Sequence, residues 1–441
     1  MAQHQQPIVV EDNDEDDDVQ LLEDGEDDDL EILDAEPIVA EIRLPLHTPG
    51  QERVADRAQR RRLDDDLFTV TECKLDYPDG STTVITVAMK VQCEKTGDIL
   101  EIYGISEEQG GRRYIRCLPF CSTLSKSLGN MLEKFPDEVC MIQQVFPGDD
   151  EPHNRDGKIL YDFCTEDLGR LKEVDLIFTN AKKNKDPAPP PRNGSTSMPT
   201  LICRWKLTQV FRTPRCSKDR KTLRQAFQRL RFSECSPGHG VSDSLFRAER
   251  DIDCSNNPSY RPPGLDGLFQ ATYTFLDAFS GSGFASLGAL LAGLRLIGAF
   301  DNNENAQLNY SHNFKKVKLW RMSQNQFLRT RAARYRGRVD VLHISFPCKY
   351  YSSAHTRPGK NDPENSIAIL GLSEFLRIIR PRIVVIEETS GLAECMKHRD
   401  SIQSLINDFT RVNYEVEHAI RNFAENGLAQ NRRRLIIIAA A

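Results

Sequence analysis

Short apolar runs alternate with stretches of helical periodicity from residue 272 to residue 441. Each run is rich in β-branched or aromatic residues and is bounded by polar or glycine-containing sequence, as expected for strands. Alternation of strand and helix is typical of a parallel sheet that helices cover on both faces. We therefore predict a doubly wound, mostly parallel, seven-stranded α/β domain of the Rossmann-like type over residues 271–441. Its expected strands are TFLDAF (274–279), LIGAFD (296–301), VKLWRM (317–322), VDVLHIS (339–345), RIVVIEE (382–388), YEVEHAI (414–420) and RRLIIIAA (433–440).

The region before this domain has a different pattern. Residues 65–180 contain runs such as TTVITVAMKVQC in which polar and apolar residues alternate, and Pro-Asp-Gly and Gly-Gly turns separate the runs. Alternation with period two predicts strands, so we expect a smaller β-rich module. The segments YIRCLPF (114–120) and MLEKFPDEVCMIQQV (131–145) resemble bromo-adjacent-homology modules. That resemblance implies a chromatin protein as partner, whereas a plain β-barrel scaffold fits the alternation equally well.

Two further segments lie between these regions. Residues 181–200 are rich in proline, glycine and serine, which predicts a linker. The connecting region 201–270 is basic, and over residues 201–231 we expect a helix with a solvated face. The interleaved aromatic residues also suit a surface that follows nucleic-acid phosphates. We predict no bound metal, because the candidate zinc ligands lack the close spacing of a zinc site; they are Cys203, Cys216, Cys235, His239 and Cys254.

Charge is distributed unevenly along the chain. Residues 1–66 carry 22 acidic and 6 basic side chains, so the rest of the chain has a net charge of +9, although the whole chain has −7. An acidic segment with few apolar residues cannot offset its ordering entropy, so we predict a disordered tail over residues 1–64. The basic remainder suits a polyanionic partner. Neither a signal peptide nor a run of about 18 apolar residues is found, which favours an intracellular protein with no membrane partner.

The first two predicted strands of the α/β domain end in sequence that suits a nucleoside. FSGSG (279–283) follows the first strand, and glycines in such a turn let backbone N–H groups approach a ligand at a helix N-terminus. Asp301 ends the second strand, where a carboxylate can accept hydrogen bonds from a ribose diol. Together they indicate a nucleoside-containing cofactor, with NAD and S-adenosylmethionine both open.

Later strand ends carry groups suited to covalent chemistry. The fourth strand delivers Pro347 and Cys348 into a loop, which makes the thiol a candidate nucleophile. The fifth strand ends in Glu387 and Glu388, of which we expect one to face the cleft, because neighbouring strand residues point to opposite faces. Before the last strand, alternate positions predict a polar wall formed by Gln430, Arg432 and Arg434. A nicotinamide enzyme leaves these groups unexplained.

This ordered series of motifs resembles the cytosine-5 DNA methyltransferases, and in particular their fungal branch associated with repeat silencing. The resemblance covers about residues 272–441 and rests on FSGSG (279–283), PCKYYS (347–352), EET (387–389) and QNRRR (430–434). It implies S-adenosylmethionine as the cofactor, DNA as the partner and substrate, and the nucleus as the location.

The resemblance also implies a role for each site residue. Cys348 would add to C6 of cytosine as a thiolate, after the base has been flipped out of the duplex. Glu387 would hold N3 and the exocyclic amine of the base. Arg432 and Arg434, within the motif that Gln430 opens, would steady the flipped nucleotide and the cysteine loop. The cofactor-binding residues would be Phe279, Ser280, Gly281, Ser282, Gly283, Asp301 and Pro347.

The chain departs from the family pattern in four places, and one of them is Asp301, where many relatives have glutamate. Lys349 follows the Pro-Cys pair where glutamine is usual, and residues 320–323 offer no aspartate for the adenine amine. The chain also ends directly after the last expected strand, so we expect a catalytic domain without its target-recognition region. Three hypotheses stay open: an active DNA methyltransferase, a catalytically impaired homologue that acts as a DNA- or chromatin-binding regulatory protein, and an RNA cytosine-5 methyltransferase.

Overall fold

The computed structural model describes residues 67–108, 110–147, 160–181, 199–212, 222–242, 244–245, 273–352 and 367–441. The predicted acidic tail and nearly all of the predicted linker lie outside these residues, as do Cys216 and Cys254. No helix in the described ranges has the length and apolar character needed to cross a membrane.

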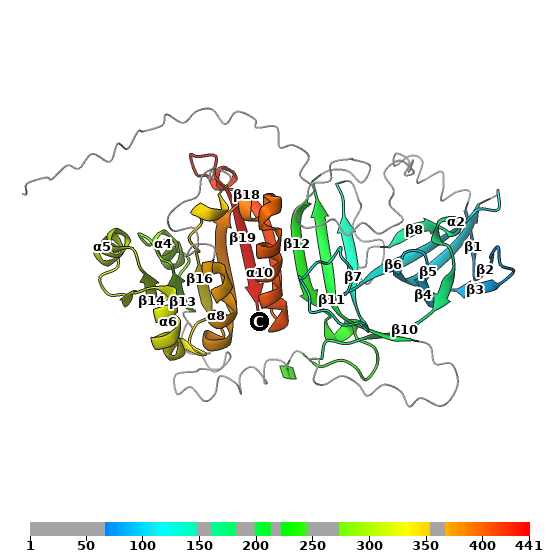
Figure 1. Cartoon of the computed structure of the whole chain (residues 1–441), viewed down its shortest axis with the longest axis horizontal. Coiled ribbons are helices and arrows are strands. Elements are labelled where there is room, and N and C mark those ends of the chain that lie inside the picture. The colour runs from blue at the N-terminus through cyan, green and yellow to red at the C-terminus, as the bar shows by residue number, and fades with distance from the viewer. Residues whose placement is uncertain are drawn as a thin grey trace, which may run out of the picture. The chain divides into compact units, whose positions relative to one another are not determined.

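Strands dominate the described residues up to 229 (Figure 1). The central antiparallel pair is β5 with β6, which β1, β4, β7 and β8 extend. Two clusters of buried apolar side chains fill this region, because alternate strand residues point inward. The strands are β1 (Leu67–Val70), β2 (Glu72–Asp76), β3 (Thr82–Thr86), β4 (Lys90–Cys93), β5 (Ile99–Glu108), β6 (Arg113–Ser122), β7 (Glu138–Val145), β8 (Tyr161–Cys164), β9 (Leu171–Glu173) and β10 (Asp175–Phe178), with the short helix α2 (Thr165–Leu168).

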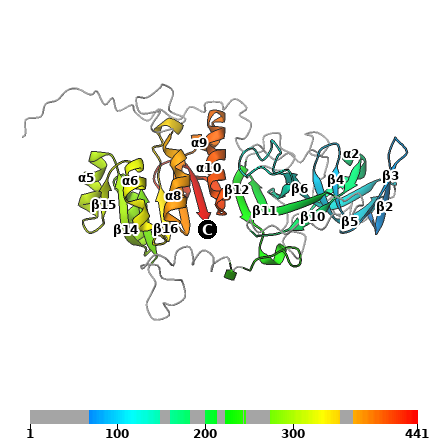
Figure 2. The ribbon, with the colours of Figure 1, turned by 60° about the horizontal axis from the view of Figure 1, so that its bottom comes forward.

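The prediction of a helix over residues 201–231 is wrong. These residues form β11 (Thr200–Phe211) and β12 (Thr222–Arg229), an antiparallel pair that runs side by side in Figures 1 and 2. Trp205, Leu207 and Phe211 are buried at period two, which is the strand pattern. The basic residues are partly used inside the fold, since Arg204 pairs with Glu138 at 3.1 Å with both side chains buried.

The α/β region begins at residue 273 and alternates strands with helices. Its strands are β13 (Thr274–Ala278), β14 (Arg295–Asp301), β15 (Leu319–Arg321), β16 (Val341–Ile344), β17 (Ile383–Thr389), β18 (Glu415–Asn422) and β19 (Arg433–Ala440). Its helices are α4 (Phe284–Leu291), α5 (Glu304–Asn313), α6 (Gln324–Thr330), α8 (Leu372–Ile379), α9 (Gly391–Glu394) and α10 (Arg399–Arg411), with the 3₁₀ turns η3 (Ala332–Tyr335), η4 (Lys349–Tyr351), η5 (Ile369–Gly371), η6 (Met396–His398) and η7 (Phe423–Asn426). The predicted α/β class is therefore confirmed.

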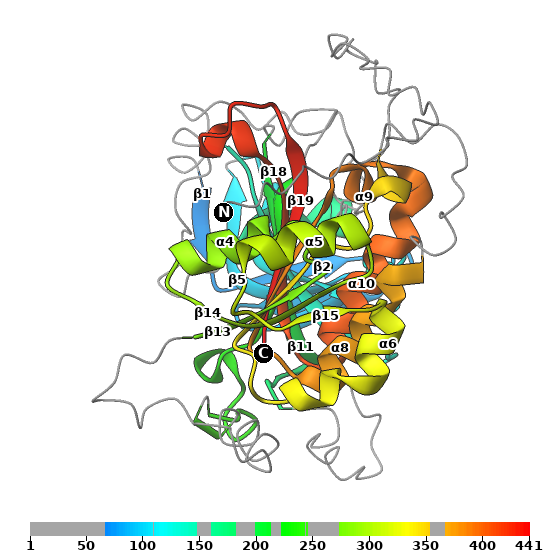
Figure 3. The same ribbon diagram turned by 90° about the vertical axis from the view of Figure 1, so that its left-hand side faces the viewer.

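The strands of this region pair in the order β15, β14, β13, β16, β17, β19, β18. All pairings are parallel up to β17, and β19 runs antiparallel to both of its neighbours. Helices α4 and α5 cover one face of the sheet, and α6, α8 and α10 cover the other (Figure 3). The carboxyl ends of β13, β14, β16 and β17 consequently meet at one edge, where ligands of such sheets bind.

Amphipathic helices close the main core. In α8, Leu372, Phe375, Leu376 and Ile379 are all buried, which is the spacing of one helix face. They lie in the same core cluster as strand residues of β13, β14 and β16 and aromatic side chains of α6 and α10. This core fixes the sheet edge that carries the predicted site residues.

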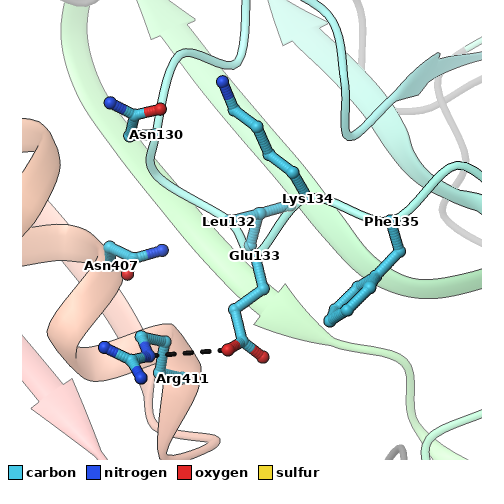
Figure 4. Close-up of a pocket in the computed structure, with 7 residues that line it drawn as sticks. All are labelled: Asn130, Leu132, Glu133, Lys134, Phe135, Asn407 and Arg411. Atoms are coloured by element: carbon cyan, nitrogen blue, oxygen red, sulfur yellow. Dashed lines mark ion pairs between the residues drawn. The ribbon is translucent and has the colours of Figure 1, made fainter.

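Strand β12 also pairs with β18, in antiparallel register from Arg224 opposite Ala419 to Phe227 opposite Val416. Beside this pairing, Thr410 donates a hydrogen bond to the Met131 carbonyl. A small pocket nearby, in which Glu133 pairs with Arg411 at 3.5 Å, is lined by Asn130, Leu132, Glu133, Lys134, Phe135, Asn407 and Arg411 (Figure 4). It contains none of the predicted site residues.

Candidate active site

The turn after β13 has an unusual backbone. Phe279, Gly281 and Gly283 all have positive φ, at 57°, 54° and 93°, a region that residues with a side chain rarely adopt. Phe279 is held there by its ring, which packs against the rings of Phe300 and Phe346 at 5.2 and 5.5 Å between centroids. Within the turn, the N–H groups of Ser280 and Gly283 donate to the carbonyls of Phe300 and Ser280, and these internal hydrogen bonds hold the glycine turn directly before α4.

An alanine at Gly283 is expected to destabilise the fold by about 2–4 kcal/mol. Alanine would have to adopt the positive φ of Gly283, which is strained for a residue with a side chain. Its Cβ would also overlap the Phe314 ring and contact Tyr310. Gly281 is the matched control, because an added Cβ there meets no atom within 4 Å. Gly281→Ala is expected to cost about 1 kcal/mol, mainly from backbone strain. Urea unfolding of both variants measures the difference, and equal losses would contradict the crowding argument.

Asp301 is buried at the end of β14, beside this turn. Its Oδ2 accepts a hydrogen bond from the Gly281 N–H and its Oδ1 accepts one from the Asn303 N–H, both at 2.8 Å. Each carboxylate oxygen has a second lone pair, so Asp301 both fixes the turn and can accept from a ligand diol. Ser280 is 7% exposed, and its Oγ has no hydrogen-bond partner among the described residues. A buried unpartnered hydroxyl beside an open glycine turn fits a ligand with polar groups.

Cys348 lies four residues after the end of β16 and directly precedes η4. Burial is the largest cause that raises the pKa of its thiol, and the nearby Glu388 also raises it, whereas Arg434 lowers it. The thiol form is therefore favoured, and the positive charge of Arg434 is the main group that favours the thiolate. Tyr351 of η4 is fully buried, which anchors the loop that carries Pro347 and Cys348.

Glu387 and two arginines meet at the end of β17. Arg434 Nε lies 3.2 Å from Glu387 Oε1, and a terminal nitrogen of Arg432 lies 3.6 Å from the same oxygen. The pairing of β17 with β19 places Thr389 opposite Arg434, which brings the arginine to the carboxylate. Gln430 lies exposed in the bend before β19. Of the predicted polar wall, Arg432 and Arg434 both contact Glu387, and the place of Gln430 in the wall stays a prediction.

Glu388, the second carboxyl group at the end of β17, is deeply buried. Its side chain is 1% exposed, and its Oε2 accepts only the N–H of Thr389, while Oε1 has no partner among the described residues. Burial raises its pKa to about 8, so the carboxyl is largely neutral at pH 7. Period-two alternation predicts that it points away from Glu387, but depth of burial is not encoded in that pattern. Glu388 therefore places a largely neutral carboxyl group next to Glu387 in the sequence of β17.

Comparisons with known proteins find similar sequences for the α/β region. Residues 273–441 match the family model of the C-5 cytosine-specific DNA methylases. The chain is 28% identical over 171 residues to the type II methyltransferase M.Sau96I of Staphylococcus aureus, covering 38% of each chain. It is also 28% identical over 168 residues to M.HpaII of Haemophilus parainfluenzae, covering 38% of this chain and 45% of the relative.

The chain spans less than half the length of these two curated relatives. Among solved structures, the Dnmt2 methyltransferase of S. pombe aligns with 19% identity and a TM-score of 0.30, over 38% of this chain and 49% of that one. The family model covers the strand ends that carry the turn, the cysteine, the glutamate and the arginines. Residues 273–441 are therefore similar in sequence to the C-5 cytosine-specific DNA methylases.

Proposed function

We propose that this protein is a DNA (cytosine-5) methyltransferase that uses S-adenosylmethionine. The observation that carries the proposal is the position of Cys348 beyond β16, next to the strand β17 on which Glu387 pairs with Arg434 and Arg432. A thiol, a carboxylate and two guanidinium groups thus lie at the same edge of the sheet. Cytosine C5 is a weak nucleophile, and this set supplies what its activation needs.

The residues would act in a fixed order. The Cys348 thiol loses its proton to solvent, and the thiolate adds to C6 of a flipped cytosine. The π electrons of the C5–C6 bond shift through C4 to N3, which takes up a proton, and the resulting enamine makes C5 nucleophilic. Glu387 accepts a hydrogen bond from the exocyclic amine and stabilises a proton at N3. After C5 has received the methyl group, C5 loses its proton to solvent, the Sγ–C6 bond breaks and the double bond is restored. Arg434 stabilises the thiolate before attack and after release.

S-adenosylmethionine, when bound, supplies the methyl group through its sulfonium centre. The Phe279 ring and the backbone of residues 280–283 would hold its nucleoside, and Asp301 would accept from its ribose diol. The unpartnered Ser280 hydroxyl supports this assignment. Pro347 would border the cofactor from the cysteine side.

Three finer assignments extend the proposal. The EET sequence at residues 387–389 supports a place in the fungal, repeat-silencing branch. The strands of residues 67–178 would form a bromo-adjacent-homology-like module that docks on chromatin proteins. A DNA substrate and a chromatin partner together support a nuclear location.

The test is methyl transfer from tritiated S-adenosylmethionine by the full chain. Duplex DNA is offered as one acceptor and transfer RNA as the other, with a duplex in which 5-methylcytosine replaces every cytosine as the matched control. We expect label in cytosine-containing DNA and none in the control. Label in RNA alone would support the RNA methyltransferase hypothesis. DNA binding without label in either acceptor would support the regulatory hypothesis and overturn the proposed activity.

A further inference from the structure

Four polar side chains meet inside the sheet face that α4 and α5 cover. Asp277 of β13 has no solvent exposure, and its Oδ1 lies 2.8 Å from His343 Nδ1 of β16. Its Oδ2 lies 2.6 Å from Ser286 Oγ of α4, and that hydroxyl lies 2.9 Å from the Tyr310 hydroxyl of α5. Ser286 and Tyr310 are fully buried and His343 is nearly so.

The hydrogen-bond roles in this network follow from the carboxylate. A carboxylate only accepts, so His343 Nδ1 and Ser286 Oγ must both donate to Asp277. The Ser286 hydroxyl has one proton, which goes to Asp277, so the Tyr310 hydroxyl must donate to Ser286. Burial raises the pKa of Tyr310, which keeps its hydroxyl a donor. Both oxygens of a fully buried charge are thereby satisfied, which an isolated buried carboxylate requires.

Each member belongs to an element that leads directly into the site. Asp277 is two residues before Phe279 of the turn, and Ser286 is in the first turn of the helix that begins after Gly283. Tyr310 belongs to the helix that follows Asp301, and His343 to the strand that leads to Cys348. The register of the parallel strands places Asp277 directly opposite His343. A buried polar pair adds little net stability to a fold, so its presence here suggests a role other than stability.

We propose that Asp277, His343 and Ser286 are positioning residues for the cofactor. Their hydrogen bonds fix the position of the turn and of α4 relative to β16, the strand that leads to Cys348. The inference rests on the proposed function. The network touches neither substrate nor cofactor, and it acts through the turn between residues 279 and 283. Loss of one donor leaves Asp277 with an unsatisfied buried oxygen, and α4 and β16 can then shift relative to each other.

The experiment compares binding of S-adenosylhomocysteine, by calorimetry, with thermal stability for variants of the full chain. His343→Leu removes the donor and is expected to weaken binding at least tenfold. His343→Asn keeps an N–H donor near the Nδ1 position and is expected to bind within about threefold of wild type. If His343→Leu does not fold, Ser286→Ala removes the other donor with the loss of one oxygen atom, and a tenfold loss is expected there too.

Thr274→Val is the matched control, because Thr274 links the same two strands at their opposite ends. Its backbone N–H and its hydroxyl both lie 2.9 Å from Asp340 Oδ2. We expect this variant to lose thermal stability while its affinity stays within about threefold of wild type. Unchanged affinity in both His343→Leu and Ser286→Ala would overturn the positioning role. So would a loss of affinity in Thr274→Val that is as large, for the same loss of thermal stability, as the loss in the network variants. A wild type that binds no S-adenosylhomocysteine would instead overturn the proposed cofactor, and the positioning role with it.

Discussion

Cys348→Ala is expected to abolish the covalent complex that wild type forms with a duplex containing 5-fluorocytosine in the presence of S-adenosylmethionine. The fluorine at C5 cannot leave as a proton, so the Sγ–C6 bond formed by wild type persists. Without the thiol no such bond can form, so the yield of the covalent complex should fall below detection. The complex is measured as a mass increase of the protein under denaturing conditions.

Cys395→Ala supplies the control for a general effect of thiol removal. Cys395 is half-buried like Cys348 and also directly precedes a 3₁₀ turn, but it belongs to the segment after β17. This variant is expected to form the complex at the wild-type level. A complex that persists in Cys348→Ala, or that disappears equally in Cys395→Ala, would remove Cys348 from the role of nucleophile. Omitting S-adenosylmethionine should prevent trapping of the wild type as well.

The ends of the strands were predictable because function and fold use the same sequence signals there. An apolar run must stop where the sheet edge meets solvent, and polar or glycine residues at that point mark both a boundary and a ligand site. The turn at residues 279–283, Asp301, Cys348 and Glu387 were all proposed on this ground, and each lies at or just beyond the end of a strand. For Gln430 the alternation argument is weaker, because it lies in an exposed bend before β19 and not in a strand.

The basic segment at residues 201–231 was mispredicted for a physical reason. Basic residues are good helix formers, and their number concealed the period-two burial of Trp205, Leu207 and Phe211. Whether this segment becomes a helix or a strand depends on the partner strands available to it. Here β7 and β12 both pair with β11. That information depends on residues far away in the chain.

The Asp277 and His343 pair was missed although its signal is visible. Each is a polar residue within an apolar strand, in FLDAF and VLHIS, and such interruptions point to an internal hydrogen bond. What the sequence does not contain is the register that places the two opposite each other. The burial of Glu388 could not be predicted for the same reason. Neighbouring elements, and not its own strand, exclude water from its side chain.

Glu388→Gln is expected to raise the free energy of unfolding more at alkaline pH than at pH 5. The difference between the two pH values should be a few kcal/mol. Burial raises the pKa of Glu388 from its ordinary 4.5 to about 8 in the folded chain. Between these values the unfolded chain has lost this proton and the folded chain retains it, so stability falls as pH rises. The slope is at most about 1.4 kcal/mol per pH unit, and the loss levels off above pH 8. Glutamine is neutral at every pH and removes this dependence.

The measurement is the free energy of unfolding in urea at pH 5, 6.5 and 8.5 for wild type and variant. Asp408→Asn is the matched control, because burial raises the pKa of Asp408 only to about 6. Its stabilising effect should be nearly complete at pH 6.5, whereas that of Glu388→Gln should continue to grow up to pH 8.5. Parallel behaviour of the two variants between pH 6.5 and 8.5 would mean that Glu388 is already ionised in the folded protein. A neutral Glu388 at pH 7 would also spare the Cys348 thiolate the repulsion of a second nearby carboxylate, which links this stability measurement to the chemistry of the site.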